Sequence, residues 1–319
     1  MLGIGHALSR CGKQVSAAAG GFDAHRHQLL QFLAQGAGVS TVDRYVDKLI
    51  RETLERRAAY VQRVTVVEAP CDEDSEIAQA NADLQGASLR ITKPSGDQEP
   101  QPKPPALVCG SVVSWPLDVL TVAGRNTLSA YLEELEPVPG TDMVHFHASP
   151  VCTGASSMNR FLNKKCRGKM RRYHARTRRG VCAMRKVIRK YRKGGFLRSK
   201  HRRSVSSEQP WNASVRNRWG TYGYPELVSR GRNMIVGVNG CVCGLRIKGV
   251  PSCKRWSIQT DNPSLAGVLA HLRCDGGHDK VKSIGGKTLQ ATGRYPRSFG
   301  RLFVMALMLK WYKRRDWAV

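Results

Sequence analysis

The chain has 319 residues, 41% of them hydrophobic, and its 52 Lys and Arg against 24 Asp and Glu give a net charge of +28. A compact protein with this charge repels itself, so we expect a polyanionic partner, and nucleic acid is the commonest one. The sequence contains no apolar run of membrane-spanning length and no secretory signal at its start, so we expect neither a membrane protein nor a secreted one.

The first 106 residues are predicted to form two regions. Residues 1–69 are expected to be mostly helical, because apolar residues recur at helical spacing over Val42–Tyr60. Residues 70–106 carry an acidic triplet, Asp72–Asp74, and a proline-rich stretch over 93–105. This composition is typical of a disordered linker.

From residue 107 the pattern alternates between short apolar strands and helices, which predicts an α/β core over 107–260. The expected strands are Leu107–Val113, Asp142–His147, Met234–Val238 and Arg255–Thr260, and the expected helices are Ser129–Leu135 and Val181–Tyr191. Residues 261–319 are expected to be a C-terminal extension that includes an apolar helix, Leu302–Tyr312.

A strongly basic segment, 160–203, interrupts this core and contains no Asp or Glu. The helix predicted at Val181–Tyr191 within it has one apolar face and one cationic face. Because no acid compensates these cations, we expect them to contact phosphates. The expected nucleic-acid-binding residues are Arg160, Lys164, Lys165, Arg167, Lys169, Arg171, Arg172, Arg178, Arg179, Arg185, Arg189 and Arg192.

A single cysteine follows the strand Asp142–His147. The strand leads into Ser149-Pro150-Val151-Cys152, and small residues come next. Strand ends of α/β enzymes commonly present nucleophiles at the carboxyl edge of the sheet. The alternative is that Cys152 is an ordinary small buried residue.

The ten cysteines are scattered and do not resemble a compact disulfide framework, so we expect a reducing compartment. Cys274 and His278 have a spacing compatible with a pair of zinc ligands. However, Cys241 and Cys243 lack the Cys-x-x-Cys spacing, so we expect no metal site.

Three segments, in chain order, resemble signatures of the DNA cytosine-5 methyltransferases, in a divergent form of the kind found in large eukaryotic genomes and mobile elements. Ser149–Cys152 is similar to the Pro-Pro-Cys loop of that family, and Glu208–Pro210 to its Glu-Asn-Pro tripeptide. Cys241–Arg246, with Lys254-Arg255 beyond, is similar to its Gln/Cys-x-Tyr-Gly-Leu block. The resemblance covers roughly 107–260.

The resemblance implies a Rossmann-like methyltransferase sheet that binds S-adenosylmethionine and DNA, with DNA preferred over RNA. Cys152 would then attack C6 of an extruded cytosine, and Glu208 would hold ring N3. Arg246, with Arg255 as the less favoured alternative, would neutralise the cytosine carbonyl or the surroundings of the thiolate. A eukaryotic protein of this kind is expected in the nucleus or in an organelle, and no protein partner is evident.

The chain departs from the family at several positions. Val151 and Gln209 replace a proline and an asparagine, and the chain opens at Gly3 and Gly5 as if it entered the cofactor loop without its strand. Asp23 is then the nearest acid for the cofactor ribose. We therefore expect an incomplete sheet, with a helical N-terminal region and a basic helical insertion. The alternative function is non-catalytic nucleic-acid binding by a mobile-element remnant.

Overall fold

The computed structural model describes residues 64–69, 75–94, 104, 106–135, 143–150, 163, 165–198, 203–210, 234–252, 254–274, 276 and 295–309. All of them lie in the larger of two compact units, Arg56–Val319. The helix predicted at Val42–Tyr60 lies outside the described residues.

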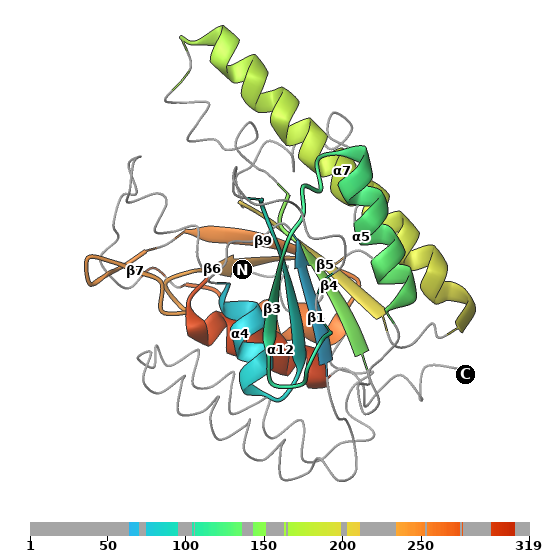
Figure 1. Ribbon diagram of the computed structural model, residues 1–319. Coiled ribbons are helices and arrows are strands. Elements are labelled where there is room, and N and C mark those ends of the chain that lie inside the picture. Colours follow the sequence, from blue (N-terminus) through green and yellow to red (C-terminus); the bar gives the residue numbers. More distant parts are fainter. Residues whose placement is uncertain are drawn as a thin grey trace. The chain divides into compact units, whose positions relative to one another are not determined.

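The described elements alternate between strands and helices (Figure 1). In chain order they are β1 (Val64–Ala69), α4 (Glu76–Asp83), β2 (Ala87–Thr92), β3 (Val112–Pro116), α5 (Val122–Glu134), β4 (Met143–Ala148), α7 (Arg167–Arg198), β5 (Arg203–Pro210), β6 (Met234–Asn239), β7 (Arg246–Ile247), β8 (Val250–Pro251), β9 (Arg255–Thr260), α10 (Pro263–Leu269) and α12 (Arg297–Leu309).

Seven strands form one α/β sheet in the order β3-β2-β1-β4-β5-β9-β6. The strands β3, β2, β1, β4 and β5 are parallel, whereas β9 runs against both β5 and β6. The chain builds outward from β1 to β3 and then returns to place β4 on the other side of β1. This reversal is the topological switch point at which open α/β sheets bind ligands, outside the carboxyl ends of the strands.

Helices cover both faces of the sheet. On one face, α5 and α7 pack against each other and over a core cluster that includes Val67, Phe146 and Val205. On the other face α12 packs against α4 and α10, and Figure 1 shows α4 and α12 together on that side.

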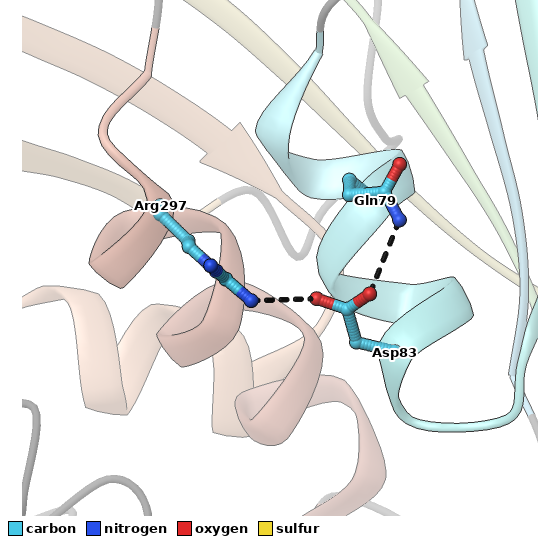
Figure 2. Close-up of polar contacts among 3 residues, drawn as sticks. All are labelled: Gln79, Asp83 and Arg297. Carbon is cyan, nitrogen blue, oxygen red and sulfur yellow. Dashed lines mark hydrogen bonds and ion pairs between the residues drawn. The ribbon is translucent and has the colours of Figure 1, made fainter.

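The contact between α4 and α12 is close because small residues line it. A Cβ atom added to Gly300 would lie 2.3 Å from the backbone oxygen of Glu76. At the rim, Arg297 pairs with Asp83 at 3.4 Å, and Gln79 donates to the same carboxylate (Figure 2). The side chain of Arg297 is 71% exposed, so this ion pair adds little stability and the buried contact holds the helices together.

The structure confirms several sequence predictions. The expected strands at 142–147, 234–238 and 255–260 correspond to β4, β6 and β9. The apolar face predicted for Val181–Tyr191 is buried within α7, at Val181, Met184, Val187, Ile188 and Tyr191. The predicted α/β class is therefore right.

Two predictions about the first part of the sheet were wrong. Residues 75–94, which we assigned to a disordered linker, form α4 and β2. The sheet also does not lack its first strand, because β1 and β2 occupy the positions next to β4 and β3. The helix α4 was missed because acidic and proline-rich segments flank this region and because the buried side chains of the helix are mostly alanine.

Boundaries also shift elsewhere. The strand expected at Leu107–Val113 begins only at Val112, because Gly110, at φ 77°, forms a turn just before it. The helix α5 starts earlier than expected, where Thr121 caps it by accepting a hydrogen bond from the Gly124 amide. The helix expected at Leu302–Tyr312 is α12, and it packs on the core rather than in a separate extension.

Candidate functional site

The carboxyl ends of β4 and β5 are joined by a buried hydrogen bond. Gln209 Nε2 donates to the carbonyl of Pro150 at 2.8 Å. The amide of Ser149 donates to Ala69 at the end of β1, at 3.1 Å. The segment that leads from β4 toward Cys152 is therefore fixed between the tips of β1 and β5 up to Pro150. Cys152 itself lies outside the described residues.

Glu208 lies next to this bond, at the end of β5 and on the opposite face of the strand from Gln209. Burial raises the pKa of Glu208 to about 7, while the positive charge of Lys254 and a hydrogen bond with Tyr295 oppose the rise. Near neutral pH this carboxyl group therefore exists in both protonation states, which suits a group that gives and takes a proton.

Aromatic side chains surround the Glu208 carboxyl on its α12 side. The ring of Tyr295 lies 5.3 Å from that of Trp256 and 4.7 Å from that of Phe299. Lys254 Nζ lies 5.9 Å from the Trp256 ring centre. These rings exclude water from one side of the carboxyl, which is the physical reason for the raised pKa.

A buried ladder of histidine and serine side chains runs beneath the site, between β4 and β5. His145 contacts Ser204 and Ser206 at 2.7 and 2.8 Å, and His147 contacts Ser206 at 2.7 Å. Because Ser206 has one proton for two imidazole nitrogens, the tautomers of the two histidines are coupled. At the top, His147 Nε2 lies 3.5 Å from the hydroxyl of Tyr295.

His147 is fully buried, and burial lowers its pKa to about 3. The imidazole is therefore neutral and acts as a hydrogen-bonding partner, not as a cation. Through Tyr295 it connects the interior of the sheet to Glu208.

The end of β1 carries the buried carboxylate of Glu68, and the hydroxyl of Ser75 at the start of α4 donates to it. Arg90 on β2 donates to the Ser75 carbonyl at 2.8 Å. The strand β2 ends at Thr92, and Lys93 follows. The resemblance places an acid for the cofactor ribose at the end of the second strand, whereas this chain has Lys93 there.

Arg246, the third predicted catalytic residue, lies in a small two-stranded hairpin outside the main sheet. Arg246 is exposed on the β7–β8 hairpin and donates to the carbonyl of Gly249 at 2.8 Å, within its own hairpin. Lys254, not Arg246, is the cation whose charge acts on Glu208. Lys254 directly precedes Arg255, the residue that was the alternative to Arg246 for the cation of the site. Tyr295 had no sequence signal, because it comes from a distant segment.

Gly3, Gly5 and Asp23, the predicted cofactor residues, lie outside the described residues. The strands β1 and β2 occupy the first positions of the described sheet, so the loop that would face a cofactor follows Ala69. The sequence of that loop, residues 70–74, contains no glycine.

Most predicted nucleic-acid-binding residues lie on α7 or just before it. Arg160 and Lys164 and the side chain of Arg192 are outside the described part of the chain. Arg185 is half-buried, and the other predicted cations are exposed: Lys165, Arg167, Lys169, Arg171, Arg172, Arg178, Arg179 and Arg189.

The structure places Cys243 in the core, where burial raises the pKa of its thiol and disfavours the metal-binding thiolate. Among the described residues, no three His, Cys, Asp or Glu side chains gather as a metal site. The described helices include none with the length and hydropathy needed to cross a membrane.

Neither the family models nor the curated proteins compared with this chain contain a match to it. The geometry of the Glu208 site is therefore the main evidence for what this chain does.

Proposed function

We propose that this chain acts on cytosine in DNA, as a divergent cytosine-5 methyltransferase. The observation that carries the proposal is the pKa of about 7 at Glu208, beside the bond that fixes the chain leading to Cys152. A carboxyl group that is protonated at neutral pH can donate to ring N3 of cytosine, which an ordinary carboxylate cannot do.

In the proposed chemistry the thiolate of Cys152 forms a bond to C6 of the base. The C5–C6 double bond opens, and Glu208 gives its proton to N3 and becomes a carboxylate. The charge of Lys254 then stabilises that carboxylate. The base must leave the duplex stack to reach these groups.

S-adenosylmethionine is the methyl donor that the resemblance implies. We derive no step through it, because Lys93 does not supply the expected ribose contact and the loop after β1 has no glycine.

The order of the strands supports the proposal. The first five strands have the order of a nucleotide-binding Rossmann sheet, and the reversed β9 is inserted between β5 and β6. A reversed strand at this position resembles the Rossmann-like methyltransferase sheet. The carboxyl edge near the switch point is then the expected place for a substrate base, and Glu208 lies at that edge.

The alternative is a nucleic-acid-binding protein that keeps the fold without catalysis. Lys93 favours it, as does the acid-free cationic face of α7. Both functions predict salt-sensitive binding, so binding alone does not separate them.

Covalent trapping separates the two functions. We expect the chain to form a denaturant-resistant adduct with duplex DNA that contains 5-fluorocytosine, only when S-adenosylmethionine is present. The variants Cys152→Ala and Glu208→Gln should abolish or strongly slow trapping, whereas Cys166→Ala, at an exposed cysteine before α7, should not. Salt-sensitive binding without any adduct would establish the alternative, and an adduct that survives Cys152→Ala would remove the proposed nucleophile.

A further inference from the structure

The helix α7 consists of two halves with different surroundings. From Thr177 to Tyr191 it buries a continuous face against the core. From Lys165 to Arg176 no residue is buried, and the segment carries cations but no acid. The core contacts of α7 that the structure describes therefore come from its second half.

The first half extends past the carboxyl edge of the sheet. Near its other end, Tyr191 donates to the carbonyl of Val144, at the amino end of β4, at 2.9 Å. Pro150 lies about 20 Å further along that strand, at about 3.3 Å per residue. The helix runs back against β4 and β5, so it reaches the level of Pro150 about 13 residues before Tyr191, near Arg178. This position agrees with the change in burial at Thr177.

Basic side chains follow one another along a single side of the projecting half. Lys169, Arg172 and Arg176 are spaced i, i+3 and i+7 in α7, which places them in one row, and Lys165 precedes this row, two residues before the helix begins. The row continues, at the same spacing, into Ala183 and Val187, which are buried against the core. These cations are therefore on the core-facing side of the helix, at the level where the sheet has ended. We call this row, together with Lys165, the overhanging stripe.

We propose that the overhanging stripe binds the phosphates of one strand of duplex DNA and holds that strand at the carboxyl edge of the sheet, on the α7 side of β4 and β5. This inference deepens the proposed function and rests on it for the identity of the base site. From Lys169 to Arg176 the stripe covers about 10 Å, which corresponds to about three phosphates of one strand at 3.4 Å per nucleotide. The rest of the cationic surface, on the solvent side of the packed half, faces away from this edge.

Duplex DNA fits the stripe better than duplex RNA for a geometric reason. A helix fits the wide major groove of B-form DNA, where its long cationic side chains can reach the phosphates of one strand. Side chains cannot enter the deep, narrow major groove of A-form RNA. The test therefore uses DNA and RNA duplexes of the same sequence.

The chain supplies a matched pair of variants on one helix. Lys165→Gln with Lys169→Gln removes two lysines at i, i+4 from the stripe, and Lys186→Gln with Lys190→Gln removes two exposed lysines at i, i+4 from the solvent side of the packed half. Both variants change the net charge equally. Thermal melts would verify that both retain the fold.

The measurement is the slope of log binding constant against log salt, by fluorescence anisotropy with a DNA duplex. We expect the stripe variant to reduce the slope by about 1.8, which is 0.9 for each lost phosphate contact, and the control variant to reduce it by less than half as much. Equal reductions in both variants, or none in the stripe variant, would overturn the proposal. Equal stripe-dependent binding to the RNA duplex would overturn the choice of DNA.

This outcome is independent of catalysis. Stripe-dependent binding without covalent trapping would contradict the proposed cytosine chemistry and support DNA binding by the stripe. Trapping that does not depend on the stripe would support the cytosine chemistry and contradict the role of the stripe.

Discussion

Gln209 donates to the backbone carbonyl of Pro150 across the tips of β5 and β4, at 2.8 Å, and both groups are buried. Its own carbonyl oxygen, Oε1, has no hydrogen-bond partner among the residues that the structure describes. The bond therefore fixes the chain before Cys152 but leaves one polar atom of the same side chain unsatisfied.

Gln209→Met removes both the donor and the unsatisfied oxygen at similar volume. We expect the free energy of unfolding to change by no more than about 1 kcal/mol, because the lost bond and the relieved oxygen offset each other. Trapping on 5-fluorocytosine DNA should slow at least tenfold, since the nucleophile loop loses its attachment to β5. Salt-dependent DNA binding is the control and should not change. Unchanged trapping would show that this bond does not position Cys152.

Glu208 should make stability depend on pH. Its pKa is raised from 4.5 to about 7, so the folded state binds the proton more tightly than the unfolded state. Stability from this group is therefore complete below pH 4.5 and is lost as the pH rises toward 7. Glu208→Gln removes this dependence, so the variant should gain up to about 3 kcal/mol over the wild type between pH 5 and pH 8. Denaturant titrations at both pH values measure the difference, and a pH-independent difference would contradict the raised pKa.

Tyr295 should tune the same carboxyl group. Its hydrogen bond lowers the pKa of Glu208, against the larger effect of burial. Tyr295→Phe removes the hydroxyl and keeps the ring, so we expect the midpoint of the Glu208 titration to move upward. Carboxyl carbon NMR of the glutamate-labelled chain follows this midpoint, with Glu208→Gln identifying the signal. A downward shift, or none, would mean that Tyr295 only packs against Glu208.

The contact between α4 and α12 offers a stability test with an internal control. Gly300→Ala would place a methyl group against the backbone of Glu76, so we expect it to destabilise the fold by about 1–3 kcal/mol. Gly267→Ala, in α10, meets nothing within 4 Å and should stabilise by about 0.5–1 kcal/mol through helix propensity. Chemical denaturation of both variants checks the opposite signs. Similar effects in both would show that α12 does not pack closely on α4.

Much of the second half of the sheet could be predicted from sequence, because its pattern is strong. The strands β4 and β9 are short apolar runs bounded by turn residues. In α7, apolar residues from Val181 onward recur at helical spacing and form the buried face. The helix α4 was missed for a physical reason. Its buried residues are Ala78, Ala80 and Ala82 with Ile77 and Asn81, and small or polar side chains give a weak hydrophobic pattern even where close packing requires them.

The site was predicted only in part. The Glu208-Gln209-Pro210 tripeptide indicated the end of β5 as part of the site. Glu208 has the raised pKa that donation of a proton to cytosine N3 would need. Lys254 and Tyr295 reach Glu208 through the pairing of β9 with β5 and the packing of α12. No local pattern encodes such long-range neighbours, so the sequence alone did not single out Lys254 or Tyr295.

The packing of α12 against α4 and β1 has a consequence for biosynthesis. The ribosome releases β1 early, but the helix that covers this face emerges more than two hundred residues later. Until then the apolar surface of β1 and α4 has no cover from α12, so the nascent chain would need chaperones during most of its translation. A premature stop codon before Arg297 would therefore yield an aggregation-prone product, even though every strand of the seven-stranded sheet had already been made.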